Sequence, residues 1–360
     1  MPSLNLNLNT LGTVSKAGVS SIDFTGITNY VFLGDSISAG SNATVGNSYR
    51  ELLVTNYATT NTDYSVGGRG TWREIKEIHT QGFTRSQTVI WEEAGLNDLR
   101  RSNVQATKNK IESCVKSVIK KTFALSGVAA GSNSVTRSGT FTPYDAESNG
   151  GVYPNLAFPD DTACFSSTVN DYWEYTFSGD NCYIVFGAAD SSKNRGDCEI
   201  RVDGDLVDTI TDLNDRADNV SDGDDPNDLV PDTRFYRGFG SGSHTLRITV
   251  TSAFPVPVDQ IGTLDDPSNV GVLMLIQIPY VTDYSKVGLD QANDSVIDAG
   301  NQIKIDLVNE FKALGYRIGF ARIMQGKGGL YDLANIDSDG VHPTNAGHLQ
   351  IYNSLIRYIG

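Results

Sequence analysis

Four short clusters along the chain combine glycines with side chains that can act as nucleophile, base or hydrogen-bond donor. They are residues 34–38 (GDSIS), 65–71 (SVGGRGT), 95–98 (GLND) and 339–343 (DGVHP). A serine hydroxyl is almost wholly protonated near neutral pH, so it needs a neighbouring base before it can attack an ester. The first and last clusters supply such a set: Ser36 as nucleophile, His342 as base, and Asp339 to orient and stabilise the imidazolium.

The three-residue spacing of Asp339 and His342 lets one loop present both groups to the same serine. Asp337 is the rival for the role of the acid. The other three histidines fit structural roles better: His79 in a helix-like segment, His244 in a hairpin turn (GSGSH), and His348 on the last helix, a turn or more beyond the pair.

Taken singly, each cluster also has a purely structural interpretation. Gly-Asp-Ser favours a strand-to-loop turn, Asn97 and Asp98 could cap a helix, and the last cluster could be a surface pair before a proline-initiated helix. Their joint occurrence in this order makes coincidence improbable and favours a catalytic site.

In order and content the four clusters resemble the conserved blocks of the SGNH (GDSL-type) hydrolases, a family of serine esterases and lipases. The resemblance implies an oxyanion hole made by the backbone N–H groups of Ser36 and Gly70 and the side-chain amide of Asn97. Each such donor lowers the barrier by about 3 kcal/mol. The family usually has Asn where this chain has Ser65, so Gly67 and Gly68 remain alternative donors. The nucleophile lacks the G-x-S-x-G pattern of α/β-hydrolases.

The segments around these clusters alternate between strand-like and helix-like patterns. Short apolar runs at residues 30–33, 88–91, 270–278 and 316–324 predict buried parallel strands, and residues 48–57, 103–125, 290–314 and 344–359 predict helices. In open α/β sheets, loops at the carboxyl ends of the strands build the site. The pattern predicts an α/β fold. The resemblance implies a flavodoxin-like three-layer SGNH hydrolase domain, formed by residues 28–126 and 270–360 after an N-terminal lead-in at 1–27.

Residues 127–269 have a different character. Apolar residues alternate with polar ones at 173–177, 182–186, 198–202 and 246–250, and Asp203-Gly204 predicts a tight hairpin turn. The segment is therefore predicted to be an inserted antiparallel β-sandwich, and the Gly- and Pro-containing stretches at its entry and exit, 127–131 and 255–267, suit domain insertion. It resembles the carbohydrate-binding modules of carbohydrate O-acetylesterases and of phage tail-associated deacetylases. Tyr172 and Trp173 could stack on sugar rings, although alternating aromatics in a sandwich are more often core.

Composition excludes several partners. A net charge of −15 disfavours nucleic acid as a partner, and no run approaches the roughly 18 apolar residues that span a bilayer.

The cysteines lack metal-ligand spacing. Cys182 and Cys198 fit buried thiols, and a disulfide among these two and Cys164 stays open. Residues 212–232 contain eight aspartates without the EF-hand register, so a Ca²⁺ site there also stays open.

These features predict a serine esterase that needs neither metal nor cofactor and removes O-acetyl groups from a polysaccharide. Two other functions stay open: a short-chain lipase or thioesterase, in which the sandwich is a lid or an oligomerisation surface, and a non-catalytic glycan-binding protein on a hydrolase scaffold. Residues 1–26 lack the pattern of a conventional signal peptide. Location is therefore open between a virion-associated extracellular protein and a cytoplasmic one.

Overall fold

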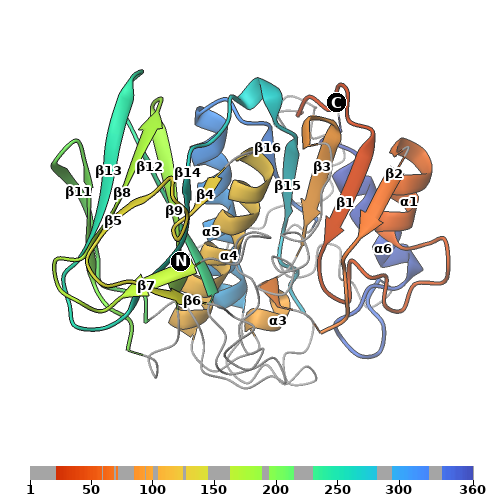
Figure 1. Ribbon diagram of the computed structural model, residues 1–360. Helices are drawn as coiled ribbons and strands as arrows, with labels where there is room; N and C mark the ends of the chain where they lie inside the picture. The colour runs from red at the N-terminus through yellow and green to blue at the C-terminus, as the bar shows by residue number, and fades with distance from the viewer. Residues whose placement is uncertain are drawn as a thin grey trace, which may run out of the picture.

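The computed structural model describes residues 22–58, 60–68, 70–71, 85–93, 95–99, 104–124, 127–144, 163–188, 194–214, 230–281, 294–323 and 335–359. One parallel sheet and two antiparallel sheets form successive layers in this part of the chain, as Figure 1 shows. The lead-in before residue 22, His79 and most of the aspartate-rich segment lie outside the described residues.

Five parallel strands form the sheet that carries the four clusters. In spatial order they are β2 (Thr60–Asp63), β1 (Asn29–Leu33), β3 (Thr88–Glu92), β15 (Val272–Ile276) and β16 (Ile318–Ala321). This is the 2-1-3-4-5 order of a doubly wound sheet, in which ligands bind where the order reverses, here between β1 and β3. The four predicted apolar strands are confirmed. The sequence did not reveal β2, because it is an exposed polar edge strand.

Helices cover both faces of this sheet (Figure 1). On the side of the antiparallel sheets lie α4 (Val104–Phe123) and α5 (Asp294–Ala313), which contact each other. On the opposite side α1 (Tyr49–Tyr57) contacts α6 (Asn345–Leu355). Ser48 begins α1 with a capping box, because its hydroxyl accepts the Glu51 N–H while the Glu51 carboxylate accepts the Ser48 N–H. One helical turn, α3 (Leu96–Leu99), follows β3.

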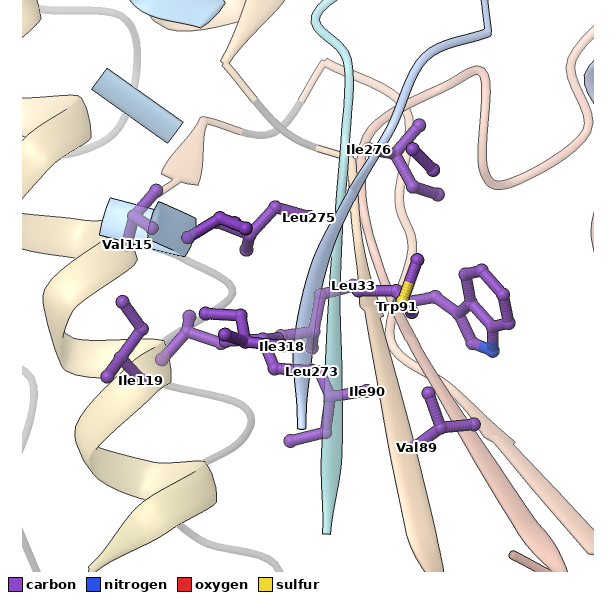
Figure 2. Close-up of a cluster of buried hydrophobic side chains, with 14 of the residues drawn as sticks. Leu33, Val89, Ile90, Trp91, Val115, Ile119, Leu273, Leu275, Ile276 and Ile318 are labelled. Carbon is purple, nitrogen blue, oxygen red and sulfur yellow. The ribbon is translucent and has the colours of Figure 1, made fainter. Parts of the chain in front are cut away.

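Figure 2 shows how the strands divide their side chains between the two faces. Leu273 and Leu275 of β15 point toward Val115 and Ile119 of α4, whereas Trp91 of β3 points to the other face. Successive side chains of a strand point to opposite faces, and each of these residues is completely or almost completely buried. The sheet is therefore buried on both faces.

The middle of the chain forms two antiparallel sheets packed face to face. One has the order β11-β10-β13-β8-β5 and the other β12-β9-β14-β7-β6, with β4 paired to β14. The bounds are β4 (Gly127–Ala129), β5 (Thr136–Ser138), β6 (Thr142–Tyr144), β7 (Ala163–Ser166), β8 (Tyr172–Ser178), β9 (Asn181–Ala188), β10 (Cys198–Val202), β11 (Asp205–Ile210), β12 (Val230–Arg237), β13 (Ser243–Val250) and β14 (Val256–Gly262). The predicted turn between β10 and β11 is confirmed, since Asp203 and Gly204 have φ of 51° and 93°.

The second of these sheets is buried on both faces. Along β9, Cys182, Ile184 and Phe186 pack in the core between the antiparallel sheets, whereas Tyr183 and Val185 pack in the core of the parallel-sheet layers. The alternation predicted from the sequence is therefore confirmed. It did not reveal that the intervening positions are buried as well.

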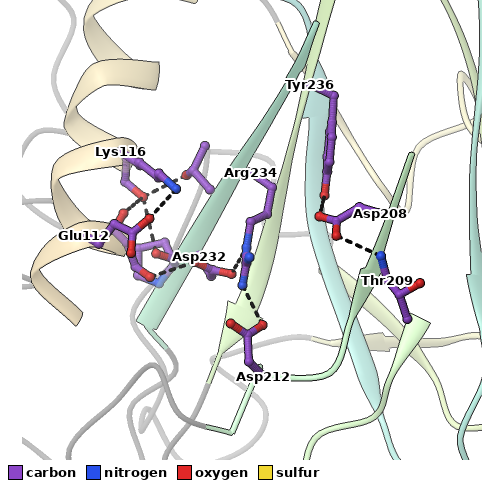
Figure 3. Close-up of polar contacts among 12 residues, drawn as sticks. Glu112, Lys116, Asp208, Thr209, Asp212, Asp232, Arg234 and Tyr236 are labelled. Atoms are coloured by element: carbon purple, nitrogen blue, oxygen red, sulfur yellow. Dashed lines mark hydrogen bonds and ion pairs between the residues drawn. The ribbon is translucent and has the colours of Figure 1, made fainter. Parts of the chain in front are cut away.

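Polar contacts join β12 to α4, as Figure 3 shows around Asp232. The Ser113 hydroxyl donates to Asp232 over 2.7 Å, and Asp232 also accepts from Arg234 Nε over 2.6 Å. Arg234 in turn pairs with Asp212 over 2.7 Å. A buried carboxylate requires such partners, so this network stabilises the packing of the sandwich against α4.

The stretches that enter and leave the sandwich, 127–131 and 255–267, consist largely of paired strands. Most of the exit is β14, which pairs with β4, β7 and β9, and the entry contains β4. A Cβ at Gly127 would lie 2.1 Å from the Tyr183 hydroxyl, so glycine allows the close approach of the chain at this point. The sandwich thus packs directly against the layers of the parallel sheet, since Tyr183 and Val185 lie in their core.

Trp173 is not available to a sugar. It is fully buried on β8, its Nε1 lies 3.0 Å from Cys164 Sγ, and its ring meets Phe141 edge-on. Inward-facing positions of a sandwich form its core, so the stacking role considered for Trp173 is wrong. Tyr172 is half-buried, and the Arg247 guanidinium lies 4.2 Å from its ring centroid.

All four cysteines are buried free thiols. This confirms the expectation for Cys182 and Cys198 and removes the disulfide left open in the sequence analysis. Burial raises the pKa of Cys182 to about 12, so its thiolate is scarce at neutral pH. Across the described ranges, every helix is too short or too polar to cross a bilayer.

Candidate active site

All four clusters lie at the carboxyl-end edge of the parallel sheet. Ser36 follows β1, Gly70 follows β2, Asn97 follows β3, and the segment with Asp339 and His342 lies between β16 and α6. Parallel strands bring these loops to one edge whatever their separation in sequence.

The nucleophile loop, residues 34–41, carries the candidate nucleophile Ser36 and is a tight turn. The Asp35 carboxylate accepts the Ile37 N–H over 2.9 Å, and the Ser36 carbonyl accepts the Ser41 N–H over 2.9 Å. A Cβ at Gly34 would lie 2.2 Å from Ser38 Oγ, so only glycine allows the loop to close this tightly. The turn buries Asp35 and leaves Ser36 half-exposed.

The three side chains of the sequence-based triad meet across this edge. Ser36 Oγ lies 2.7 Å from His342 Nε2, although the residues are 306 positions apart. His342 Nδ1 lies 2.6 Å from Asp339 Oδ2. This network assigns the Nδ1–H tautomer, which leaves Nε2 free of its proton and able to accept from the serine.

Asp339 is held by four donors. Its Oδ1 accepts the N–H groups of Val341 (2.9 Å) and His342 (3.0 Å), and its Oδ2 accepts from the His342 ring and from Asn42 Nδ2 (3.0 Å). Partial burial raises the pKa of this carboxyl, but the hydrogen bonds from the His342 side chain and from the two N–H groups outweigh it and lower the pKa to about 2. Asp339 is therefore ionised at neutral pH.

Asp337, the rival acid, is directed elsewhere. Its side chain is exposed, and its Oδ1 accepts the N–H of Ser338 over 2.6 Å. Only its backbone relates it to the base, because its N–H donates to the His342 carbonyl over 2.9 Å. This geometry pairs His342 with Asp339.

The candidate oxyanion donors lie around the loop that carries Ser36. Asn97 Nδ2 donates to Asp35 Oδ2 over 2.9 Å, which orients the amide beside the nucleophile loop. A Cβ at Gly67 would lie 3.6 Å from the Cβ of Ser36, whereas a Cβ at Gly70 would lie 2.7 Å from Asp98 Oδ1. Gly67 thus borders the nucleophile, and Gly70 allows its loop to close onto Asp98. Both stay candidate donors, as does Gly68; Gly67 and Gly68 are exposed and Gly70 is buried.

The other described histidines have structural partners, as expected. His348 is fully buried, and its Nδ1 and Nε2 lie 3.5 Å and 3.4 Å from the Tyr49 N–H and the Ser41 carbonyl. Burial lowers its pKa. His244 lies 2.7 Å from Asp203 at the hairpin turn, far along the chain from the triad.

Sequence reasoning missed Asn42 and Glu93. Asn42 contacts Asp339 from a position 297 residues away, and Glu93 accepts from Ser38 Oγ over 2.9 Å beneath the nucleophile loop. The sequence contains one local signal for Glu93: two acidic residues, Glu92 and Glu93, follow an apolar strand. Burying a carboxylate at such a place costs free energy unless it has a hydrogen-bonding or charged partner. Asn42 carries no local signal beyond its left-handed φ of 65°, which asparagine tolerates.

No protein-family model and no curated protein matches this sequence. Among solved structures, it is similar to a two-domain esterase (CEX) active on acetylated mannans, with 13% identity and a TM-score of 0.35 over 72% of this chain and 95% of that one. It is also similar to a family 35 carbohydrate-binding module from Clostridium thermocellum (16% identity, TM-score 0.28, 39% of this chain and 100% of that one). A third is the CBM36-1 domain of a multidomain xylanase from the hindgut metagenome of Trinervitermes trinervoides (14% identity, TM-score 0.26, 39% of this chain and 97% of that one).

At these identities and TM-scores the likenesses carry no argument about function. The mixed α/β architecture with one parallel and two antiparallel sheets is established by the strand pairing itself. The function is therefore argued from the geometry of the site.

Replacing Asn42 with glycine is expected to lower kcat about 3- to 10-fold, because a hydrogen bond to a charged group typically contributes on the order of 1 kcal/mol when it is exposed. Glycine accepts the left-handed backbone, so the loop keeps its shape. Steady-state kinetics on an activated acetyl ester measure the effect. Asn47→Ala, in the same loop but bonded to Thr44, serves as control, and an unaltered kcat in Asn42→Gly would exclude this role.

Proposed function

We propose that the protein is a serine ester hydrolase of the SGNH type, built on a flavodoxin-like sheet. One observation carries the proposal: Ser36 Oγ, His342 and Asp339 form a continuous hydrogen-bonded relay with distances of 2.7 Å and 2.6 Å. A hydroxyl, an imidazole and a carboxylate in this order are the parts that activate a serine.

In the proposed mechanism Ser36 attacks the ester carbonyl while His342 Nε2 takes its proton. Asp339 stabilises the imidazolium, which then protonates the departing alcohol. The negative oxygen of the tetrahedral intermediate is stabilised by the Asn97 amide and by backbone N–H groups of Ser36 and of Gly70 or Gly67. Water, activated by the same histidine, hydrolyses the acyl-serine and regenerates the enzyme.

We further propose that the substrate is an acetyl ester on a polysaccharide. The triad lies at the surface: Ser36 is half-exposed, and the side chains of His342 and Asp339 are 25% and 40% exposed. An open site of this kind can be reached by an acyl group on a bulky carrier, and Gly67 places no side chain beside Ser36, where a Cβ would lie 3.6 Å from the Ser36 Cβ. These features support a large carrier as the leaving alcohol.

The test compares acyl length and carrier size. We expect kcat/KM for p-nitrophenyl acetate to exceed that for long-chain esters by at least about tenfold, as one or two misplaced methylene groups cost about 1–3 kcal/mol. Acetate release from a panel of acetylated polysaccharides then identifies the carrier. Preference for long chains would indicate a lipase or thioesterase, and no turnover of any ester would indicate a glycan-binding scaffold.

A further inference from the structure

A buried chain of polar groups lies beneath the nucleophile loop. Ser38 Oγ contacts the Tyr49 hydroxyl (2.5 Å) and donates to Glu93 Oε2 (2.9 Å), which also accepts the Asp35 N–H (3.4 Å). Asp35 also accepts from the Asn97 amide over 2.9 Å. The chain thus connects Glu93 to a candidate oxyanion donor, and each of its members is at least 95% buried.

The charges in this region do not balance if every carboxyl is ionised. Glu92 pairs with Lys304 over 2.7 Å, and Asp98 lies 3.6 Å from Lys110. Neither Asp35 nor Glu93 forms an ion pair of its own among the residues that the structure describes. Two adjacent buried carboxylates without such partners are strongly disfavoured, and sharing one proton relieves the repulsion.

Hydrogen bonding points to Glu93 as the holder of that proton. Asp35 accepts two hydrogen bonds, one at each oxygen, which stabilise its ionised form. Glu93 Oε1 is buried without a hydrogen-bond partner in the described structure. Burying a charged oxygen without a hydrogen bond costs several kcal/mol of desolvation free energy, whereas burying a neutral carboxylic acid costs far less.

We propose that Asp35 and Glu93 form an acid pair with one shared proton, and that protonated Glu93 is a positioning residue for Asp35, the nucleophile loop and the Asn97 amide. The inference rests on the proposed function. Ionised Asp35 orients Asn97 by accepting from its amide. A second negative charge at Glu93 opposes the negative oxygen that develops beside Ser36, so turnover falls when the shared proton is lost.

The surrounding groups agree with this assignment. Burial, followed by the charge of Asp35, raises the pKa of Glu93 to about 8, while burial raises that of Asp35 to about 6. The titratable and charged groups that face Glu93 are Asp35, Tyr49, Glu92 and Lys304. Beyond them lie Arg50 and His348 next to Tyr49, Asp98 next to Asp35 and Glu92, and Lys110 next to Asp98. The proton is therefore expected to leave near pH 8.

The kinetic test is the pH profile of kcat for an activated acetyl ester with wild type, Glu93→Gln and Glu93→Ala. We expect wild-type kcat to fall above about pH 8 and the fall to be absent in Glu93→Gln, which keeps a hydrogen-bonding side chain but cannot ionise. The kcat of Glu93→Ala should be about tenfold or more lower at every pH, since the change removes the side chain that joins the buried hydrogen-bond network. An unchanged alkaline fall in Glu93→Gln overturns the proposal.

A second readout does not need activity. Infrared difference spectra between about pH 7 and pH 10, recorded in the Ser36→Ala background, should show the loss of a protonated carboxyl band that the additional Glu93→Gln change removes. Glu92→Gln, which alters the neighbouring carboxylate, is the matched control and should keep the band. Absence of the band, or its persistence in Glu93→Gln, overturns the acid pair. Failure of the esterase proposal alone would leave this infrared result intact.

Discussion

Replacing Ser36 with alanine is expected to lower kcat/KM for an acetyl ester by about three orders of magnitude or more, while the fold stays intact. The reason is that the acyl-enzyme can no longer form, and residual catalysis comes only from binding and the oxyanion donors. Steady-state kinetics and circular dichroism measure the two parts of this expectation. The small change removes one oxygen from a half-exposed loop position, so stability should change by less than about 1 kcal/mol.

A fluorophosphonate probe gives an independent reading of the same residue. It should label wild-type protein at Ser36 and leave Ser36→Ala unlabelled. Ser41→Ala is the matched control, because Ser41 lies in the same loop and its described contacts use backbone atoms. Labelling at a different serine would show that the nucleophile has been assigned wrongly.

Asp339→Asn should have the second largest effect, with kcat lower by up to about 10⁴-fold. An amide in this position can donate to His342 Nδ1, which would favour the wrong tautomer and place a proton on Nε2, where the serine needs an acceptor. Some members of the family that the sequence resembles tolerate loss of this acid, so the magnitude reports how far His342 depends on it.

Asp337→Asn is the control for the acid, because Asp337 lies two residues earlier in the same turn and its carboxylate accepts from the Ser338 backbone. Its kcat should stay within about threefold of wild type, in line with an exposed substitution that changes stability by less than about 0.5 kcal/mol. A larger loss at Asp337 than at Asp339 would show that the carboxylate was assigned to the wrong residue.

The sequence by itself determined the features that depend on neighbouring residues. The apolar run at 30–33 predicts β1, alternation predicts the sandwich strands, and Asp203-Gly204 predicts their hairpin turn, because each pattern reports a local backbone geometry. The three-residue spacing also identified Asp339 and His342 as a pair within one loop. Such patterns predict local structure whatever the rest of the fold, since the contacts involved span only a few residues.

Only the tertiary structure determined the features that depend on contacts between residues far apart in the sequence. Alternation along β9 cannot tell whether its second face meets water or a helix, and only the packing against α4 shows that Tyr183 is buried there. Likewise, the Pro-containing stretch at 255–267 carries no strand pattern, and only its pairing with β9 shows that most of it is β14. Asn42 reaches Asp339, and Glu93 reaches Asp35, because parallel strands bring distant loops to one edge of a sheet. Hydrogen bonding and burial depend on distance in space, which no spacing along the chain records.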